Sequence, residues 1–86
     1  MGKAMALNAM SADLEEIMHF DPEEGILELD KHMARLTEAA AARGFQFDRH
    51  AARNELQAAT FGRRAAATAR LLLSPTGTMA IEVRSA

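Results

Sequence analysis

The clearest local signals lie in residues 21–45, which read DPEEGILELDKHMARLTEAAAARGF. Asp21 is a favourable helix N-cap, Pro22 suits the first helical position, and Glu24 stands where a capping box places its glutamate. Gly44 is the expected stop, because glycine readily adopts the left-handed conformation that ends many helices. The segment therefore predicts a helix of roughly 22 residues.

Apolar residues recur along this predicted helix at alternating spacings of three and four, which places them on one helical face. They are Ile26, Leu29, Met33, Leu36 and Ala40. Such a stripe either packs into the core of its own domain or binds a partner helix, and core packing is the more common use. Both uses stay open for this chain.

The residues before Asp21 show the same helical spacing. Its positions are Leu7, Met10, Leu14 and Ile17. A first helix is therefore expected between about residues 3 and 19, and only a short connector separates it from the second. Helices joined so closely pack side by side, so we expect an acidic antiparallel helical hairpin over residues 3–43.

The second half of the chain predicts a third helix and a β-hairpin. Asp48 is a suitable N-cap for a basic helix over residues 48–66, in which Leu56 and Phe61 are the large apolar residues. In residues 70–84, an apolar run is followed by a turn containing Pro and Gly and then by a strand of alternating polarity. The predicted fold class is mainly α with a small β part.

The length of 86 residues bounds the chain to a single domain, 1–86, and to a thin core. Hydrophobic residues make up 49% of the sequence, but nineteen residues are alanine, which contributes little burial. A core of this kind leaves a lone monomer marginally stable. We therefore expect a homo-oligomer or a complex with a larger protein.

The net charge of −2 conceals an uneven distribution. Residues 1–42 carry three basic and nine acidic residues, whereas residues 43–86 carry seven arginines and three acidic residues. The two halves therefore have net charges of −6 and +4. Such asymmetry predicts pairing within the monomer, pairing between protomers, or contact between the basic half and an anionic partner.

Several classes of function and location are disfavoured. There is no Cys, the Ser residues lie in no nucleophile-elbow context, and the five Gly form no phosphate loop. We accordingly expect no enzyme, no cofactor and no small-molecule substrate. The first ten residues lack the apolar core of a signal peptide, and no apolar run is long enough to span a membrane. The expected location is the cytoplasm, and the Ala and Arg bias suggests a bacterial source.

Two Glu and His combinations could bind a metal ion. Glu16 and His19 form a Glu-x-x-His step, and Glu28 and His32 lie one turn apart on the predicted second helix. A complete site needs further ligands directed into the interior of a bundle, whereas Glu16 and His19 flank the predicted apolar face. We therefore expect no metal, and a metal-binding helical protein is the third alternative.

Nucleic-acid binding is the second alternative. Its candidate residues are Arg49, Arg53, Arg63 and Arg64. Arginine suits phosphate and guanine contacts, and three helices followed by a hairpin is the element order of a winged helix. A helix-turn-helix frame can be laid over residues 36–54, but it places His50 and Arg53 where the motif needs apolar residues. A solvated arginine face, or one paired with the acidic half, is the simpler interpretation.

Residues 11–56 resemble the nitrogen-fixation-type leader domain of ribosomally made modified peptides. The resemblance rests on a first helix ending at Phe20, an Asp-Pro-Glu start to the second helix, a Gly44-Phe45 stop and a third helix ending at Glu55 and Leu56. It implies a partner that an enzyme recognises. The chain departs from that pattern because no Gly-Gly or Gly-Ala processing site follows Leu56 and the tail has no Cys.

These observations together predict a non-catalytic protein-interaction module. It would act as a homo-oligomer, such as a homodimer, or as a subunit, adaptor or leader-type partner of a larger protein. Nucleic acid is a possible partner and a membrane is not. The residues expected to bind a protein partner are Leu29, Met33, Leu36, Met79, Ile81 and Val83.

Overall fold

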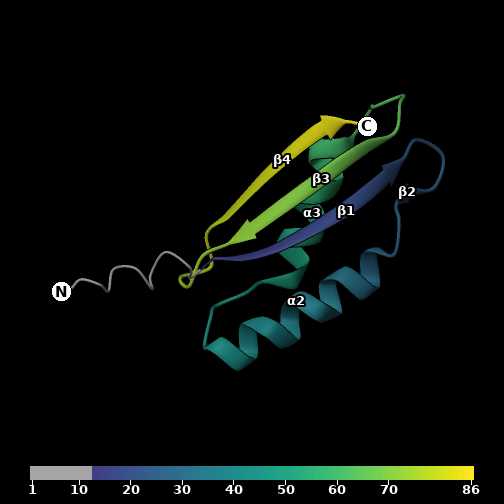
Figure 1. Ribbon diagram of the computed structural model, residues 1–86. Helices are drawn as coiled ribbons and strands as arrows, with labels where there is room; N and C mark the ends of the chain where they lie inside the picture. Colours follow the sequence, from purple (N-terminus) through teal and green to yellow (C-terminus); the bar gives the residue numbers. More distant parts are fainter. Residues whose placement is uncertain (1–12) are drawn as a thin grey trace.

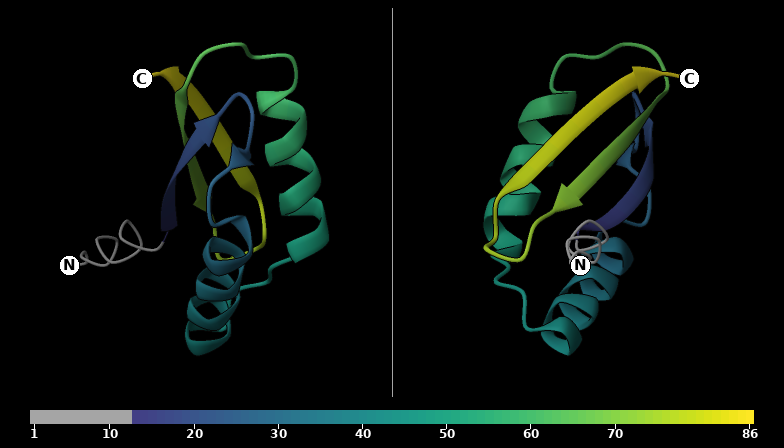
Figure 2. Two further views of the ribbon diagram at one scale, coloured as in Figure 1. Left: turned by 90° about the vertical axis from the view of Figure 1, so that its right-hand side faces the viewer. Right: turned by 60° about the vertical axis from the view of Figure 1, so that its left-hand side comes forward.

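A four-stranded antiparallel sheet with both helices on one of its faces makes up the fold (Figure 1; Figure 2). A computed structural model describes residues 13–86. The strands are β1 (Leu14–Asp21), β2 (Gly25–Ile26), β3 (Ala67–Leu73) and β4 (Met79–Ser85), and the helices are α2 (Leu29–Arg43) and α3 (Arg49–Thr60). The strand order is β2-β1-β3-β4, so β1 and β3 are the central strands.

Strand β1 replaces most of the described part of the predicted first helix, so that prediction is wrong there; residues 3–12 lie outside the described residues. Its inward side chains come at every second position, with Met18 and Phe20 buried. Glu16 also points inward and interrupts the apolar alternation that would have indicated a strand. Ile17, which completed the helical spacing, is instead 52% exposed on the other face.

Asp21 does accept hydrogen bonds from the backbone that follows it, but these bonds stabilise a turn and not the start of a helix. The Asp21 carboxylate accepts hydrogen bonds from the amides of Glu23 and Glu24, at 2.9 and 2.8 Å. These are the bonds that an N-cap would make, and an Asx-turn uses the same ones. Gly25 follows with a φ of 85°, and the chain folds back as β2 along β1. Helix α2 therefore begins only at Leu29.

The predicted stop of α2 and the predicted start of α3 are both confirmed. Gly44 adopts a left-handed conformation with a φ of 72°. The amide of Phe45 donates to the carbonyl of Ala40, as in a Schellman motif. Asp48 caps α3 by accepting from the amide of Ala51 at 3.0 Å, and α3 ends at Thr60, short of the predicted residue 66.

The C-terminal hairpin is present, but it belongs to a larger sheet. Gly77 has the left-handed conformation, with a φ of 96°, and its amide donates to the carbonyl of Ser74. Strand β3 also pairs along its whole length with β1, from Leu14 opposite Leu73 to Phe20 opposite Ala67. The prediction of a mainly α fold with a helical hairpin and a third helix is therefore wrong, because the described residues form two helices and four strands.

The core lies between the sheet and the two helices. Its buried members are Met18, Met33, Leu36, Ala40, Ala52, Leu56, Ala69, Leu71 and Leu73. The six residues predicted to bind a partner all lie here. Met33 and Leu36 are fully buried, and Leu29, Met79, Ile81 and Val83 pack against the core from its edges.

Substitutions of two adjacent leucines in β3 test which face of the sheet packs against the core. Leu71 is fully buried beneath the helices, whereas Leu72 points to the opposite face and is half-buried. Replacing Leu71 with Ala should lower the free energy of unfolding by about 2–5 kcal/mol, because it leaves a cavity in a packed interior. Leu72→Ala should cost less than about 1 kcal/mol. Urea denaturation measures both, and equal losses would contradict this assignment of the faces.

Candidate functional site

A buried ion pair joins the sheet to α2. Glu16 Oε1 lies 2.6 Å from His32 Nδ1, and Glu16 Oε2 lies 3.3 Å from Arg35 Nε. The side chains of Glu16 and His32 are only 14% and 13% exposed. Because the carboxylate can only accept, His32 Nδ1 carries the hydrogen, and its 3.1 Å approach to Arg35 Nη2 is a contact between two donors.

The environment of Glu16 favours its charged form. Partial burial would raise its pKa, but hydrogen bonds from His32 and Arg35, with the charges of both, outweigh burial and lower the pKa below the ordinary value of 4.5. The ion pair therefore fixes β1 against α2 and holds a carboxylate ionised beside the core. Glu16 and His32 lie between the sheet and the helix, Arg35 covers them from the solvent side, and we interpret the cluster as part of the scaffold.

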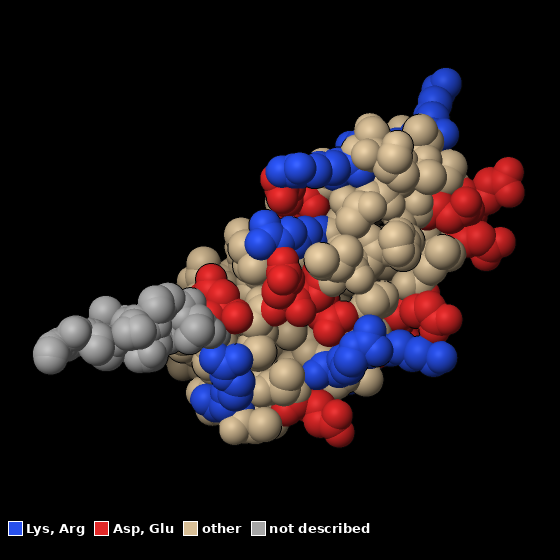
Figure 3. All heavy atoms as spheres, in the orientation of Figure 1, with Lys and Arg blue, Asp and Glu red and all other residues tan. Residues whose placement is uncertain are grey.

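The face of the sheet opposite the helices is uncovered. We call it the open face, and its residues are Glu15, Ile17, His19, Thr68, Arg70, Leu72, Ala80, Glu82 and Arg84. Figure 3 views the molecule from this side and shows acidic and basic side chains mixed across it. An antiparallel sheet commonly packs one face on a core and leaves the other polar.

Arg70 stands on the central strand β3 and organises the charges of the open face. Its guanidinium hydrogen-bonds Glu15 on β1 and lies 3.7 Å from Glu82 on β4. Glu82 in turn pairs with Arg84 at 3.1 Å. The hydrogen bond and charge of Glu15, followed by those of Glu82, raise the pKa of Arg70 above its ordinary value. The four charges balance one another, so the open face does not present an uncompensated anion site.

Two shallow hollows flank Arg70 on the open face. One, of about 250 Å³, is lined by Ile17, Thr68, Arg70, Glu82 and Arg84. The other, of about 260 Å³, is lined by Arg70, Leu72, Ala80, Ile81 and Glu82. Each is lined by apolar side chains and by both members of the Arg70–Glu82 ion pair. The open face can therefore receive apolar side chains of an opposing surface and offer carboxylate and guanidinium groups around them.

The four arginines considered for nucleic-acid binding do not form one patch. Arg53 pairs with Asp30 of the acidic half at 2.6 Å, which supports pairing of the two halves within the monomer. Arg49 stands at the start of α3, whereas Arg63 and Arg64 lie beyond its far end, beside a cleft. One helix length therefore separates the two groups.

The candidate metal ligands are also kept apart. Glu16 and His19 point to opposite faces of β1, and Glu28 pairs with Lys31 while His32 bonds Glu16. Among residues 13–86, no group of three or more His, Asp or Glu side chains is placed to hold a metal ion. Within the same range, no helix is long and apolar enough to cross a membrane.

Sequence reasoning overlooked the open face. Its signal was the period-two series Glu15, Ile17 and His19, which alternates with the buried Met18 and Phe20. The helical spacing of Leu14 and Ile17 masked that series.

Comparison with known proteins gives one informative likeness. No protein-family model matches the chain, and no curated protein matches it. A crystal structure named "Putative amino-acid aminotransferase", from Mesorhizobium loti, is 33% identical to the chain, with a TM-score of 0.79. The match covers 85% of this chain, and the chain spans 35% of the length of that protein.

This likeness corrects the functional prediction. A non-catalytic module acting as an adaptor, leader-type partner or oligomer subunit was expected, with a nucleic-acid regulator and a metal-binding protein as alternatives. The solved structure points instead to a part of an enzyme. The resemblance to a leader domain finds no support in the comparisons and stays untested.

The ion pair at Glu16 can be tested by its dependence on pH. Because the pKa of Glu16 is lowered in the folded state, its contribution to stability is complete above about pH 5 and is lost as the pH falls through the folded pKa. Glu16→Gln should lower the free energy of unfolding by about 1–3 kcal/mol at neutral pH. The variant should also lose less stability than the original chain when the pH is lowered.

Glu15→Gln is the matched control, since Glu15 is the preceding residue but lies exposed on the open face. It should change the stability by less than about 1 kcal/mol at neutral pH. Thermal denaturation at several pH values measures all three proteins. If Glu16→Gln kept the full acid dependence of the original chain, the proposed role of the ion pair would be wrong.

Proposed function

We propose that this chain forms the sheet lobe of an aminotransferase-like enzyme, which moves an amino group between an amino acid and a 2-oxo acid. The observation that carries the proposal is the likeness to the Mesorhizobium loti protein, which combines 33% identity with a TM-score of 0.79. The lobe corresponds to 35% of that protein, so the remaining part of the enzyme must supply what this lobe lacks.

Aminotransferases use pyridoxal phosphate, which a lysine holds as a Schiff base. Lys31 is the one lysine among residues 13–86, and its side chain is 75% exposed and paired with Glu28 at 3.2 Å. Schiff-base lysines are typically desolvated in a pocket, whereas Lys31 is exposed and already paired with a carboxylate. The described residues therefore do not fit the cofactor, and in this proposal the remaining part of the enzyme binds it.

The open face is the surface through which this lobe would meet the rest of the enzyme. The helix side of the sheet is already filled by the core, whereas the open face has no covering element among the described residues. Ile17, 52% exposed, stands at its centre with a hollow beside it. The balanced ion pairs around Arg70 suit a surface that is covered by protein, because they leave no isolated charge to bury.

A chimera tests the proposed function. Residues 13–86 replace the matched segment of the Mesorhizobium loti protein, after transamination by the parent has been measured with a panel of amino acids and 2-oxo acids. The chimera should fold, bind pyridoxal phosphate as the parent does, and retain transamination. A chimera that folds and binds the cofactor but transfers no amino group, while the parent is active, would contradict the proposal.

A substitution at the centre of the open face tests the packing surface. Ile17→Glu should lower kcat/KM of the chimera by roughly tenfold or more, because a new charge would be buried between the two parts. In the 86-residue chain the same change should alter the free energy of unfolding by less than about 1 kcal/mol.

Leu27→Glu is the control, because Leu27 is also an exposed apolar residue, at 41%, but follows β2 and lies outside the open face. It should leave kcat/KM of the chimera nearly unchanged. Equal losses from the two substitutions would show that the open face has no special part in assembling the enzyme.

A further inference from the structure

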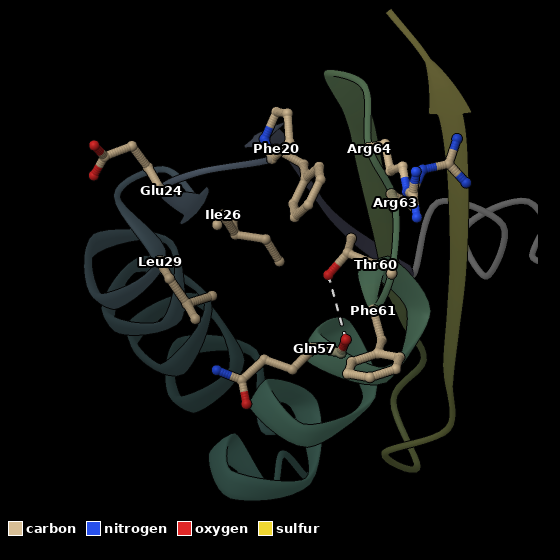
Figure 4. A pocket seen from close by; sticks show the side chains of 12 residues that line it. Phe20, Glu24, Ile26, Leu29, Gln57, Thr60, Phe61, Arg63 and Arg64 are labelled. Carbon is tan, nitrogen blue, oxygen red and sulfur yellow. Dashed lines mark hydrogen bonds between the residues drawn. The ribbon is translucent and has the colours of Figure 1, made fainter.

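A cleft on the helix side of the sheet is separate from the open face. It opens between the β1–β2 hairpin, the start of α2, and the loop that leads from α3 to β3 (Figure 4). Its volume of about 550 Å³ falls within the range of sites for small molecules. None of the residues that line it belongs to the open face.

The interior of the cleft is apolar. Figure 4 shows the side chains of Phe20, Ile26 and Leu29 directed into it from the sheet and α2. Phe61 stands at the rim, and its side chain is 87% exposed, the most of any large apolar residue among those described. Thr60 is buried and donates its hydroxyl to the carbonyl of Leu56. The cleft is therefore suited to a flat apolar group, which would stack on or pack against the phenylalanine rings.

Positive charge borders the cleft on one side. Arg63 and Arg64 follow Phe61 and Gly62, and Figure 4 shows their guanidinium groups on the side of the cleft nearest β4. Arg63 makes a long hydrogen bond of 3.4 Å to the hydroxyl of Ser85. Neither arginine forms an ion pair with a carboxylate of residues 13–86, in contrast to Arg35, Arg53, Arg70 and Arg84. Two adjacent cations without such a partner favour an anion nearby.

The one carboxylate of the lining does not neutralise these arginines. Glu24 belongs to the turn on the opposite side, and Figure 4 shows its carboxylate directed away from the cleft. The amide of Gln57 lies at the mouth and adds an uncharged polar group. The arrangement is thus asymmetric, with apolar walls at the β2 side and cations at the β4 side.

We propose that this cleft binds a small flat apolar molecule that carries an acidic group. The apolar body would lie among Phe20, Ile26, Leu29 and Phe61, and the acidic group would reach the guanidinium groups of Arg63 and Arg64. The site does not depend on the proposed aminotransferase function, because it lies on the opposite side of the sheet from the open face. It therefore adds a ligand-binding site to the lobe.

The test uses the ¹⁵N-labelled 86-residue chain and two probes of nearly equal shape, 2-naphthoate and the neutral 2-naphthamide. Titration followed by NMR should move the amide signals of Ile26 and of residues 60–64. The naphthoate should bind at least roughly fivefold more tightly than the amide, a difference of about 1 kcal/mol. Equal affinities, no shifts at millimolar concentration, or shifts confined to other regions would each overturn the proposal.

Three variants separate the contribution of the arginine charges to ligand binding from the contribution of the apolar walls. Replacing Arg63 and Arg64 together with Ala should abolish the preference for naphthoate, whereas Phe61→Ala should weaken both probes. Arg49→Ala is the matched control, because Arg49 also lacks an ion pair with a carboxylate of the described residues but stands at the other end of α3. It should leave both affinities unchanged, and an equal loss with Arg49→Ala would show that the preference reflects overall charge and overturn the site.

All of these substitutions are at exposed or half-buried positions, so the variants should remain folded. The dispersion of their NMR spectra checks this before titration. If the arginine double variant, once shown to be folded, still preferred naphthoate, the assignment of the acidic group to this rim would be wrong.

Discussion

The antiparallel pairing of β1 with β3 is the constraint on which the rest of the structure depends. It joins residues 14–20 to residues 67–73 in one continuous ladder, although both helices lie between them in the sequence. Without this pairing, the C-terminal hairpin would be an isolated pair of strands, which is barely stable in water. With it, four strands present one continuous apolar face, and α2 and α3 can close a core against that face.

The same pairing determines where polar groups can be used. Inward positions of β1 are apolar except for Glu16, whose charge is compensated by His32 and Arg35 of α2. That ion pair fixes the helix to the central strand, and it places one polar group of β1 beside the core. Outward positions of the three long strands bring Glu15, Arg70 and Glu82 into one ladder of charges. The sheet thus separates a scaffold side from a side that is free to contact another surface.

Both proposals follow from this separation. The open face has balanced charges and two shallow hollows, as expected of a surface that meets another part of an enzyme. The cleft lies on the other side, where the β1–β2 hairpin and the α3–β3 loop diverge, and there the arginines have no carboxylate partner among the described residues. The solved structure that the chain resembles is a larger protein, and the chain spans 35% of its length.

The sequence by itself determined the features that depend on neighbouring residues. The Gly44 stop, the Asp48 cap, the Ser74–Gly77 turn and the buried stripe of Met33, Leu36 and Ala40 are all visible in local patterns. Only the tertiary structure decided whether residues 14–21 are a strand, because Leu14 and Ile17 fit a helix and Glu16 hides the alternation of a strand. Asp21 makes the same hydrogen bonds in a turn as it would at a helix start, so its sequence context cannot distinguish them. Local patterns could show at most the β1 part of the open face. The open face and the cleft each assemble residues far apart in the chain, and the long-range pairing of β1 with β3 sets their proximity.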